Sequence, residues 1–67
     1  MIKQLTEEEF YSLESGKDIG IFYYVSSYPR WYCAVYKKNR KPTSNIWNNE
    51  EMAFNWMKRV EECFYRC

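Results

Sequence analysis

Three cysteines are the residues of this chain whose type and spacing come closest to reactive chemistry. They are Cys33, Cys63 and Cys67, and the last two are four positions apart, which puts both on one face of a helix. A thiolate can bind a metal ion or act as a nucleophile. However, the chain has no histidine, and three cysteines without a fourth ligand make a poor structural zinc site. We therefore expect no metal and no cofactor, and reduced thiols as in a cytoplasmic protein.

The other arrangements that support catalysis are also missing from the sequence. No histidine can serve as a general base, and no serine or cysteine has an obvious partner that would activate it. Glu50 and Glu51 are adjacent, but adjacent side chains on a helix point in different directions. Gly16 and Gly20 are the only glycines, so the chain has no glycine-rich phosphate loop. The sequence predicts a protein that is not an enzyme.

Aromatic and basic residues indicate a binding surface instead. Segment 20–38 holds seven of the fourteen aromatic residues. The net charge is only +1, yet residues 30–41 sum to +5, whereas residues 1–18 sum to −3 and residues 42–67 to −1. The positive charge is therefore local, and the chain is not basic enough overall to favour strong nonspecific binding to nucleic acid.

The length of the chain limits its organisation and its stability. We expect residues 1–67 to form one small domain whose stability is only a few kcal/mol. Dense packing of aromatic rings would supply part of that stability, and a homodimer is an alternative source. No apolar run approaches the roughly 18 residues needed to cross a bilayer, and the first residues have no apolar signal region.

Capping signals and an apolar stripe predict two helices. Thr6 and Glu9 form a capping box at the start of a short helix that ends at residues 15–16. Asn48, with Glu51 three positions later, predicts the start of a longer C-terminal helix. The apolar stripe of this second helix consists of Ala53, Trp56, Met57, Val60, Cys63, Phe64 and Cys67.

Alternation with a period of two predicts strands between the helices. Residues 21–25 and 31–36 form an antiparallel hairpin through a turn at 26–30. The polar loop 37–42 leads to a short third strand, Thr43–Trp47. The expected fold class is therefore α+β, with the order α-β-β-β-α. The C-terminal helix packs on one face of a three-stranded antiparallel sheet, and the N-terminal helix closes an edge or end.

The alternation also divides the hairpin side chains between two faces. The face expected to pack against the C-terminal helix consists of Ile21, Tyr23, Val25, Trp31, Cys33 and Val35. The opposite face consists of Phe22, Tyr24, Tyr32 and Tyr36. Four rings on an uncovered face form an apolar patch of the size that usually marks a binding site. The alternatives are that the short N-terminal helix, or a second copy of the chain, covers these rings.

Residues 31–60 combine a strand that opens with tryptophan, a basic loop, an aromatic residue before a helix, and a tryptophan on that helix. The residues of this pattern are Trp31, Tyr36, Lys37, Trp47, Glu51, Ala53 and Trp56. The pattern resembles the arm-type N-terminal DNA-binding domain of phage tyrosine integrases, an AP2-like three-stranded fold. The resemblance implies a helix that backs the sheet and a sheet face that enters the major groove of DNA. The chain departs from the family in its acidic N-terminal segment and in having Trp47-Asn48 where phenylalanine and threonine are usual.

Two functions of different classes fit these features. The first is a small phage or mobile-element protein that inhibits or modulates a host protein or a defence complex, as anti-CRISPR proteins do, through the aromatic face and the basic loop. The alternative is nucleic-acid binding, by stacking of single strands or by docking in a duplex groove. We expect a host or defence protein as the partner, and no membrane. Both functions use the same residues: Phe22, Tyr24, Arg30, Tyr32, Tyr36, Lys37, Lys38, Arg40 and Lys41.

Overall fold

The computed structural model describes residues 2–66, with side chains for residues 2–64. Its elements, in chain order, are β1 (Ile2–Gln4), α1 (Glu7–Tyr11), β2 (Gly20–Val25), β3 (Trp31–Tyr36), β4 (Thr43–Trp47) and α2 (Glu50–Arg66). The strands form one sheet in the order β1-β2-β3-β4. The pair β1 and β2 is parallel, and the other two pairs are antiparallel. The α+β class is confirmed, but the prediction of three antiparallel strands is wrong, since the sheet is mixed and has a fourth strand.

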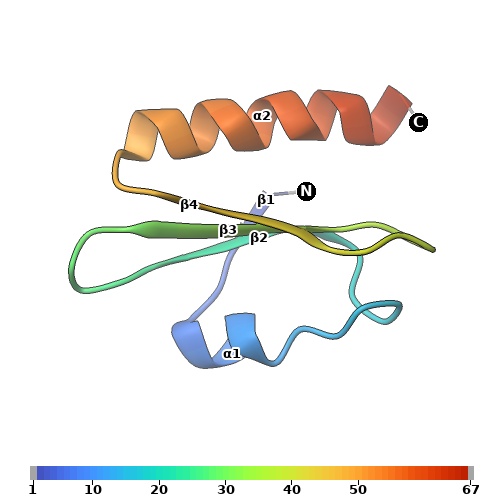
Figure 1. Ribbon diagram of the computed structural model, residues 1–67, viewed down its shortest axis with the longest axis horizontal. Coiled ribbons are helices and arrows are strands. Elements are labelled where there is room, and N and C mark those ends of the chain that lie inside the picture. Colours follow the sequence, from blue (N-terminus) through green and yellow to red (C-terminus); the bar gives the residue numbers. More distant parts are fainter. Residues whose placement is uncertain (1, 67) are drawn as a thin grey trace.

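The two helices lie on opposite faces of the sheet (Figure 1). Helix α2 runs along one face, and the short α1 lies below the other face. Because parallel strands cannot be joined by a tight turn, the chain must cross over between β1 and β2, and α1 is part of that crossover. The molecule therefore has three layers, and the second face of the sheet is partly covered by the N-terminal segment.

The start of α1 follows the capping prediction, but its end does not. The hydroxyl oxygen of Thr6 accepts a hydrogen bond of 3.1 Å from the backbone N–H of Glu9, and the Glu9 carboxylate accepts one of 3.0 Å from the N–H of Thr6. The bond from the Thr6 N–H also lowers the pKa of Glu9. The helix ends at Tyr11, and not at residues 15–16 as predicted.

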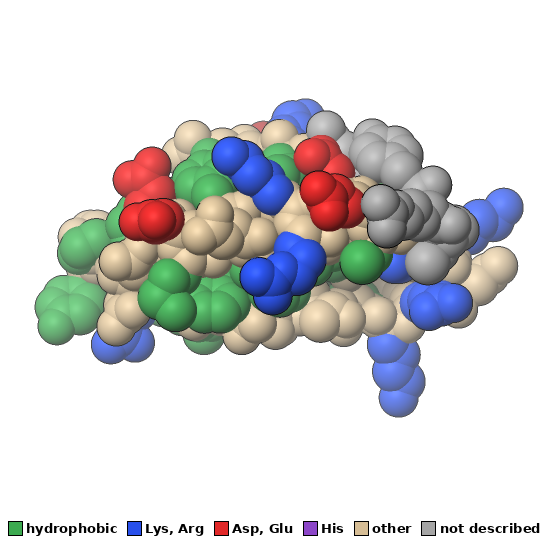
Figure 2. All heavy atoms as spheres, turned by 90° about the horizontal axis from the view of Figure 1, so that it is seen from above, with side chains coloured by type: hydrophobic (Ala, Val, Ile, Leu, Met, Phe, Trp, Pro, Cys, Tyr) green, Lys and Arg blue, Asp and Glu red, His purple; other side chains and the backbone are tan. Residues whose placement is uncertain are grey.

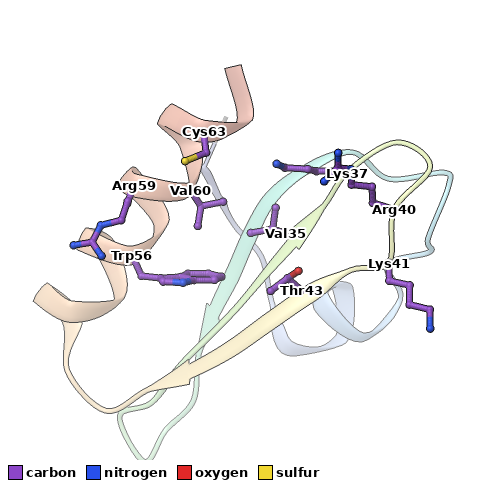
Figure 3. Close-up of a pocket in the computed structure, with 9 residues that line it drawn as sticks. All are labelled: Val35, Lys37, Arg40, Lys41, Thr43, Trp56, Arg59, Val60 and Cys63. Carbon is purple, nitrogen blue, oxygen red and sulfur yellow. The ribbon is translucent and has the colours of Figure 1, made fainter. Parts of the chain in front are cut away.

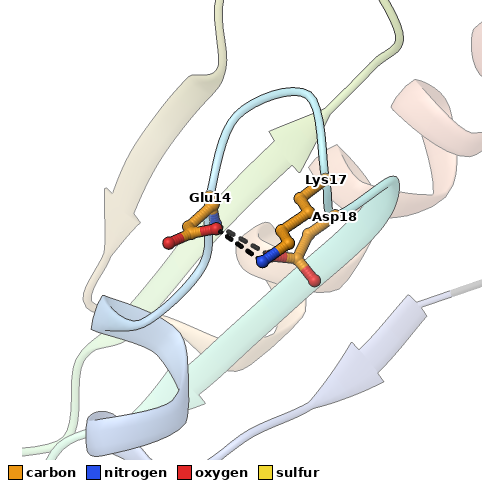
Figure 4. Close-up of polar contacts among 3 residues, drawn as sticks. All are labelled: Glu14, Lys17 and Asp18. Carbon is orange, nitrogen blue, oxygen red and sulfur yellow. Dashed lines mark hydrogen bonds and ion pairs between the residues drawn. The ribbon is translucent and has the colours of Figure 1, made fainter.

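A separate turn between α1 and β2 uses the predicted stop signal (Figure 4). The backbone N–H of Glu14 donates a hydrogen bond of 2.8 Å to the carboxylate of Asp18, and the Lys17 ammonium lies 3.4 Å from the Glu14 carboxylate. Gly16 adopts a φ of 88° inside this turn, which is a conformation that glycine accepts readily. The Ser-Gly pair therefore reverses the chain after the helix has already ended.

The hydrophobic core lies between the sheet and α2. Its buried residues are Ile21, Cys33, Val35, Ala53 and Met57. Ile21, Cys33 and Val35 were expected on this face, and their burial confirms the assignment. Val25 was expected there as well, but it is 38% exposed, since it is the last residue of β2, next to the hairpin turn. Gly20 opens β2 with a φ of 146°, and a Cβ at this position would lie 3.2 Å from the Phe22 ring.

Helix α2 begins one residue later than its capping signal suggested. The Asn49 side-chain oxygen accepts a hydrogen bond of 3.1 Å from the N–H of Met52, so Asn49 is the cap and not Asn48. The predicted stripe is largely confirmed, with Ala53 and Met57 buried, but Cys63 is exposed. Cys67 lies outside the described residues. Neither helix, as far as it is described, is long and apolar enough to cross a membrane.

Because Cys33 is buried, we expect the protein to become less stable as the pH rises into the alkaline range. Desolvation raises the pKa of the Cys33 thiol to about 11, whereas a cysteine in an unfolded chain has a pKa of about 8.5. Between these values the unfolded state loses a proton that the folded state keeps, so the free energy of unfolding falls as pH rises. We expect a loss of about 1.4 kcal/mol between pH 7 and pH 9.5, measured by urea unfolding.

The variant that isolates this effect is Cys33→Ala. It should be less stable than the wild type at every pH, but its free energy of unfolding should not fall between pH 7 and pH 9.5. Cys63→Ser, which changes an exposed thiol, should keep it. A decline of equal size in Cys33→Ala would contradict the assignment to Cys33.

Candidate functional site

Tyr24, which was expected on an uncovered face, is buried beneath α1. Its side chain is only 4% exposed. Its ring centroid lies 4.9 Å from that of Phe10 and 5.6 Å from that of Tyr11, and the two tyrosine hydroxyls are hydrogen-bonded at 2.8 Å. On its other side, Tyr24 stacks on Tyr32 with the rings 4.6 Å apart and nearly parallel. The expectation that Tyr24 is exposed is therefore wrong, and the alternative, coverage by the N-terminal helix, holds for this ring.

The rest of this face is only partly covered. Phe22, Tyr32 and Tyr36 are half-buried, and the rings of Phe22 and Tyr36 meet edge to face at 6.0 Å. Helix α1 lies against β2, so the part of the face formed by β3 and β4 extends past it. There Ile46, which lies opposite Tyr32 in the strand register, is 57% exposed. A smaller patch remains open than the sequence indicated.

The predicted basic residues divide into two places. Lys37, Lys38, Arg40 and Lys41 lie in the loop between β3 and β4. Arg30 precedes β3 at its opposite end, where its guanidinium lies 5.4 Å from the centre of the Tyr28 ring. Strand β3 therefore separates Arg30 from the other four cations, and the predicted residues do not form one continuous site.

The basic loop borders a hollow of about 430 Å³ between α2 and the strands β3 and β4 (Figure 3). Trp56 and Val60 of α2 point toward the strands, and with Val35 they form an apolar floor. The side chains of Lys37, Arg40, Lys41 and Arg59 also line the hollow, together with Thr43 and Cys63. No acidic residue is among the described residues that line it. An anion in this hollow would meet positive charge on both sides.

The cationic side chains of this hollow differ in how firmly other residues hold them in place. Lys37 reaches back toward α2, and its ammonium lies 5.5 Å from the centre of the Phe64 ring. Lys41 and Arg59 extend outward from the rim, and both are exposed. Figure 2 looks down on α2 and shows basic side chains at the end of the molecule that holds the β3–β4 loop. The rim therefore combines one cation held against a ring with three exposed cations, Arg40, Lys41 and Arg59, that can reorient toward a ligand.

A second hollow, of about 270 Å³, continues along β4 toward its other end. Trp56 and Arg59 line both hollows, and Trp47, Met52 and Asn55 complete the second. The indole N–H of Trp47 is buried and has no hydrogen-bond partner among the described residues. Thr43 lines the first hollow and Trp47 the second, so the two depressions together follow β4 from its first residue to its last.

Sequence reasoning missed Trp56 and Arg59 as site residues. Trp56 was assigned to the core stripe of the helix, and it is in fact half-buried at the edge of that core. Arg59 fell off the stripe and carried no signal of its own. Its position three residues after Trp56 puts both on the side of α2 that faces β4. Only the placement of α2 over the sheet joins this arginine to the basic loop.

Comparison of the chain with protein-family models, with curated proteins and with solved structures finds no match. Within the described residues, no group of three or more potential metal-ligating side chains comes together.

Proposed function

We propose that this protein is a non-enzymatic binding protein that holds an acidic segment of a partner protein in the hollow between α2 and β4. The observation that carries the proposal is the set of four cations, from the β3–β4 loop and from Arg59, around an apolar floor. Positive charge on the rim attracts and orients an acidic partner. Burial of the apolar floor by apolar groups of the partner then stabilises the complex. The combination is typical of a protein interface, where anchors lie at the centre and charges at the rim.

The wider role that we propose is steric inhibition or modulation of a host or defence protein by a phage or mobile-element protein. The rings that remain partly open on the α1 side, Phe22, Tyr32 and Tyr36, would extend the contact with such a partner. Arg30 and Lys38 would contribute charge at its margins. Tyr24 takes no part, because α1 covers it.

Nucleic-acid binding is the second candidate, and the basic rim is the observation that favours it. The integrase-like mode would put the face opposite α2 into a DNA groove. Helix α1 lies on that face and packs on Tyr24, so a duplex would have to displace it. Stacking of single strands is limited as well, since Tyr24 and Tyr32 stack on each other. We therefore favour a protein partner.

A charge-reversal pair tests the proposed site. Lys41→Glu with Arg59→Glu replaces two exposed rim cations and leaves the core intact. We expect this pair to weaken binding of the acidic peptide Ac-(Glu-Gly)5-NH2 by about tenfold or more, because two favourable ion pairs become repulsions. The measurement is an NMR titration of the ¹⁵N-labelled protein at low salt, with a single-stranded and a duplex DNA of equal charge as competing probes.

The matched control is Lys3→Glu with Lys58→Glu, which changes the net charge equally at exposed positions that line neither hollow. Equal weakening by both pairs would mean that net charge alone attracts the peptide, and would overturn the site. Tighter binding of DNA than of peptide at the same salt concentration would favour the second candidate.

Affinity capture from a bacterial lysate, with and without nuclease, would then connect the site to the wider role. The protein partner that we propose is retained by the wild type and by the control pair after nuclease treatment. It is lost with the Lys41/Arg59 pair. A protein lost from all baits upon nuclease treatment would point to nucleic acid as the bridge.

A further inference from the structure

We propose that the acidic segment binds as an added strand along the open edge of β4, with acidic and apolar residues in alternation. This inference rests on the proposed function and specifies its mode of binding. In this mode the free backbone groups of β4 bind the partner, in addition to the charged side chains around the hollow.

The first observation is the exposed edge of the sheet. Strand β4 is the last strand in the sheet order, and among the described residues it pairs with β3 on one side only. Four of its five side chains are exposed, and no residue from Thr43 to Trp47 is charged or a proline. Edge strands are commonly protected by charges, prolines or bulges, because their free N–H and C=O groups can pair with another chain. The edge of β4 has none of these within its length.

The second observation is that the two hollows follow this edge on the α2 side. Thr43 and Trp47 line them, so the odd-numbered residues of β4 face α2. The even-numbered residues face the opposite way, and among them Ile46 is 57% exposed beside Tyr32. The side chains of an added strand would alternate in the same manner.

The chemistry of the partner follows from these two surroundings. On the α2 side, every second side chain of the added strand would lie near Lys41 and Arg59, where a carboxylate is favoured. On the other side, the remaining side chains would lie beside the exposed Ile46, with Tyr32 one strand further in, and an apolar residue there removes surface from water. The segment that fits is therefore an extended one in which acidic and apolar residues alternate.

A second copy of this chain is a less suitable occupant. An antiparallel copy would bring its own Thr43–Trp47 strand to the edge, and that strand carries no carboxylate to place opposite Arg59. It would also bring a second Arg59, a residue that lines both hollows along β4, to the same edge of the sheet, where the two copies would add positive charge without a carboxylate to balance it. The charges of this edge are thus complementary to a different chain.

Two peptides of equal charge test the mode of binding without altering the protein. Ac-(Glu-Val)5-NH2 can add as a strand, whereas Ac-(Glu-Pro)5-NH2 has no N–H at every second residue and cannot form a regular ladder. We expect the valine peptide to bind the wild-type protein about tenfold more tightly in NMR titrations. We also expect it to slow amide hydrogen exchange in residues 43–47, whereas the proline peptide does not.

Each outcome separates this inference from the proposed function. Equal binding of the two peptides, with no protection of residues 43–47, would overturn strand addition and leave an acidic-partner site in place. Failure of both peptides to bind at low salt would overturn the proposed function, and strand addition with it. Light scattering on the free protein measures its oligomeric state. A dimer in which the amides of residues 43–47 are already protected from exchange would show that a second copy occupies the edge, and this result would also overturn the inference.

Discussion

Replacement of Tyr24 by alanine is expected to leave the protein largely unfolded at 25 °C. The ring is packed between Phe10 and Tyr11 of the α1 segment on one side and Tyr32 on the other. Removal of a buried aromatic ring costs about 3–5 kcal/mol. A domain of this size has about 3–5 kcal/mol of stability in total, so one substitution consumes most of it. The measurement is urea unfolding followed by circular dichroism.

Two matched variants separate packing from hydrogen bonding and exposure. Tyr24→Phe keeps the ring and loses the 2.8 Å hydroxyl contact with Tyr11, which should cost about 1 kcal/mol. Tyr28→Ala removes a tyrosine that is 75% exposed, and should change the free energy of unfolding by less than about 0.5 kcal/mol. A wild-type midpoint for Tyr24→Ala would mean that α1 does not pack on this face in solution.

Replacement of Met57 by alanine is the second substitution with a large expected effect. Met57 is fully buried, and it joins α2 to the core residues Ile21, Cys33 and Val35. A buried methionine that becomes alanine loses about 2–5 kcal/mol, from lost burial and from the cavity that remains. Because α2 covers the buried core residues on this face of the sheet, its loosening should expose the core as well. We expect the urea midpoint to fall sharply.

The controls for Met57 lie at the same site and on the same helix. Met57→Leu nearly conserves the volume and should cost less than about 1.5 kcal/mol. Met52→Ala removes a side chain of the same type that is 50% exposed, and should cost much less than Met57→Ala. Equal losses for Met52→Ala and Met57→Ala would contradict the orientation of α2 described above.

Much of the strand arrangement could be predicted from the sequence, because alternation with a period of two is a local signal. It located β2, β3 and β4 closely and assigned Ile21 and Cys33 to the core. It could not find β1, since Ile2–Gln4 is too short to show a pattern. That strand exists because β2 offers it a pairing edge, and this is a tertiary effect.

The aromatic face shows the same limit. Its rings were correctly separated from the core side, but the sequence left open what covers them. The answer depends on β1, which the sequence did not reveal. Because β1 and β2 are parallel, the segment between them must cross over one face of the sheet, and this brings Phe10 and Tyr11 over Tyr24. The basic loop was found from its composition alone. Arg59 was not, because its contribution depends on where α2 lies.

Two small residues, Gly20 and Ala53, are the positions that we expect a distant relative of this protein to retain. At Gly20 the positive φ disfavours any side chain and a Cβ would press against the Phe22 ring, and Ala53 is fully buried where α2 meets the sheet. Evolution can exchange one large apolar core residue for another, or change the exposed surface of β4 to suit a new partner. It has far less freedom at these two positions. A glycine just before the first core residue, and a small residue early in the last helix, should therefore persist in relatives whose aromatic residues and basic loop have changed.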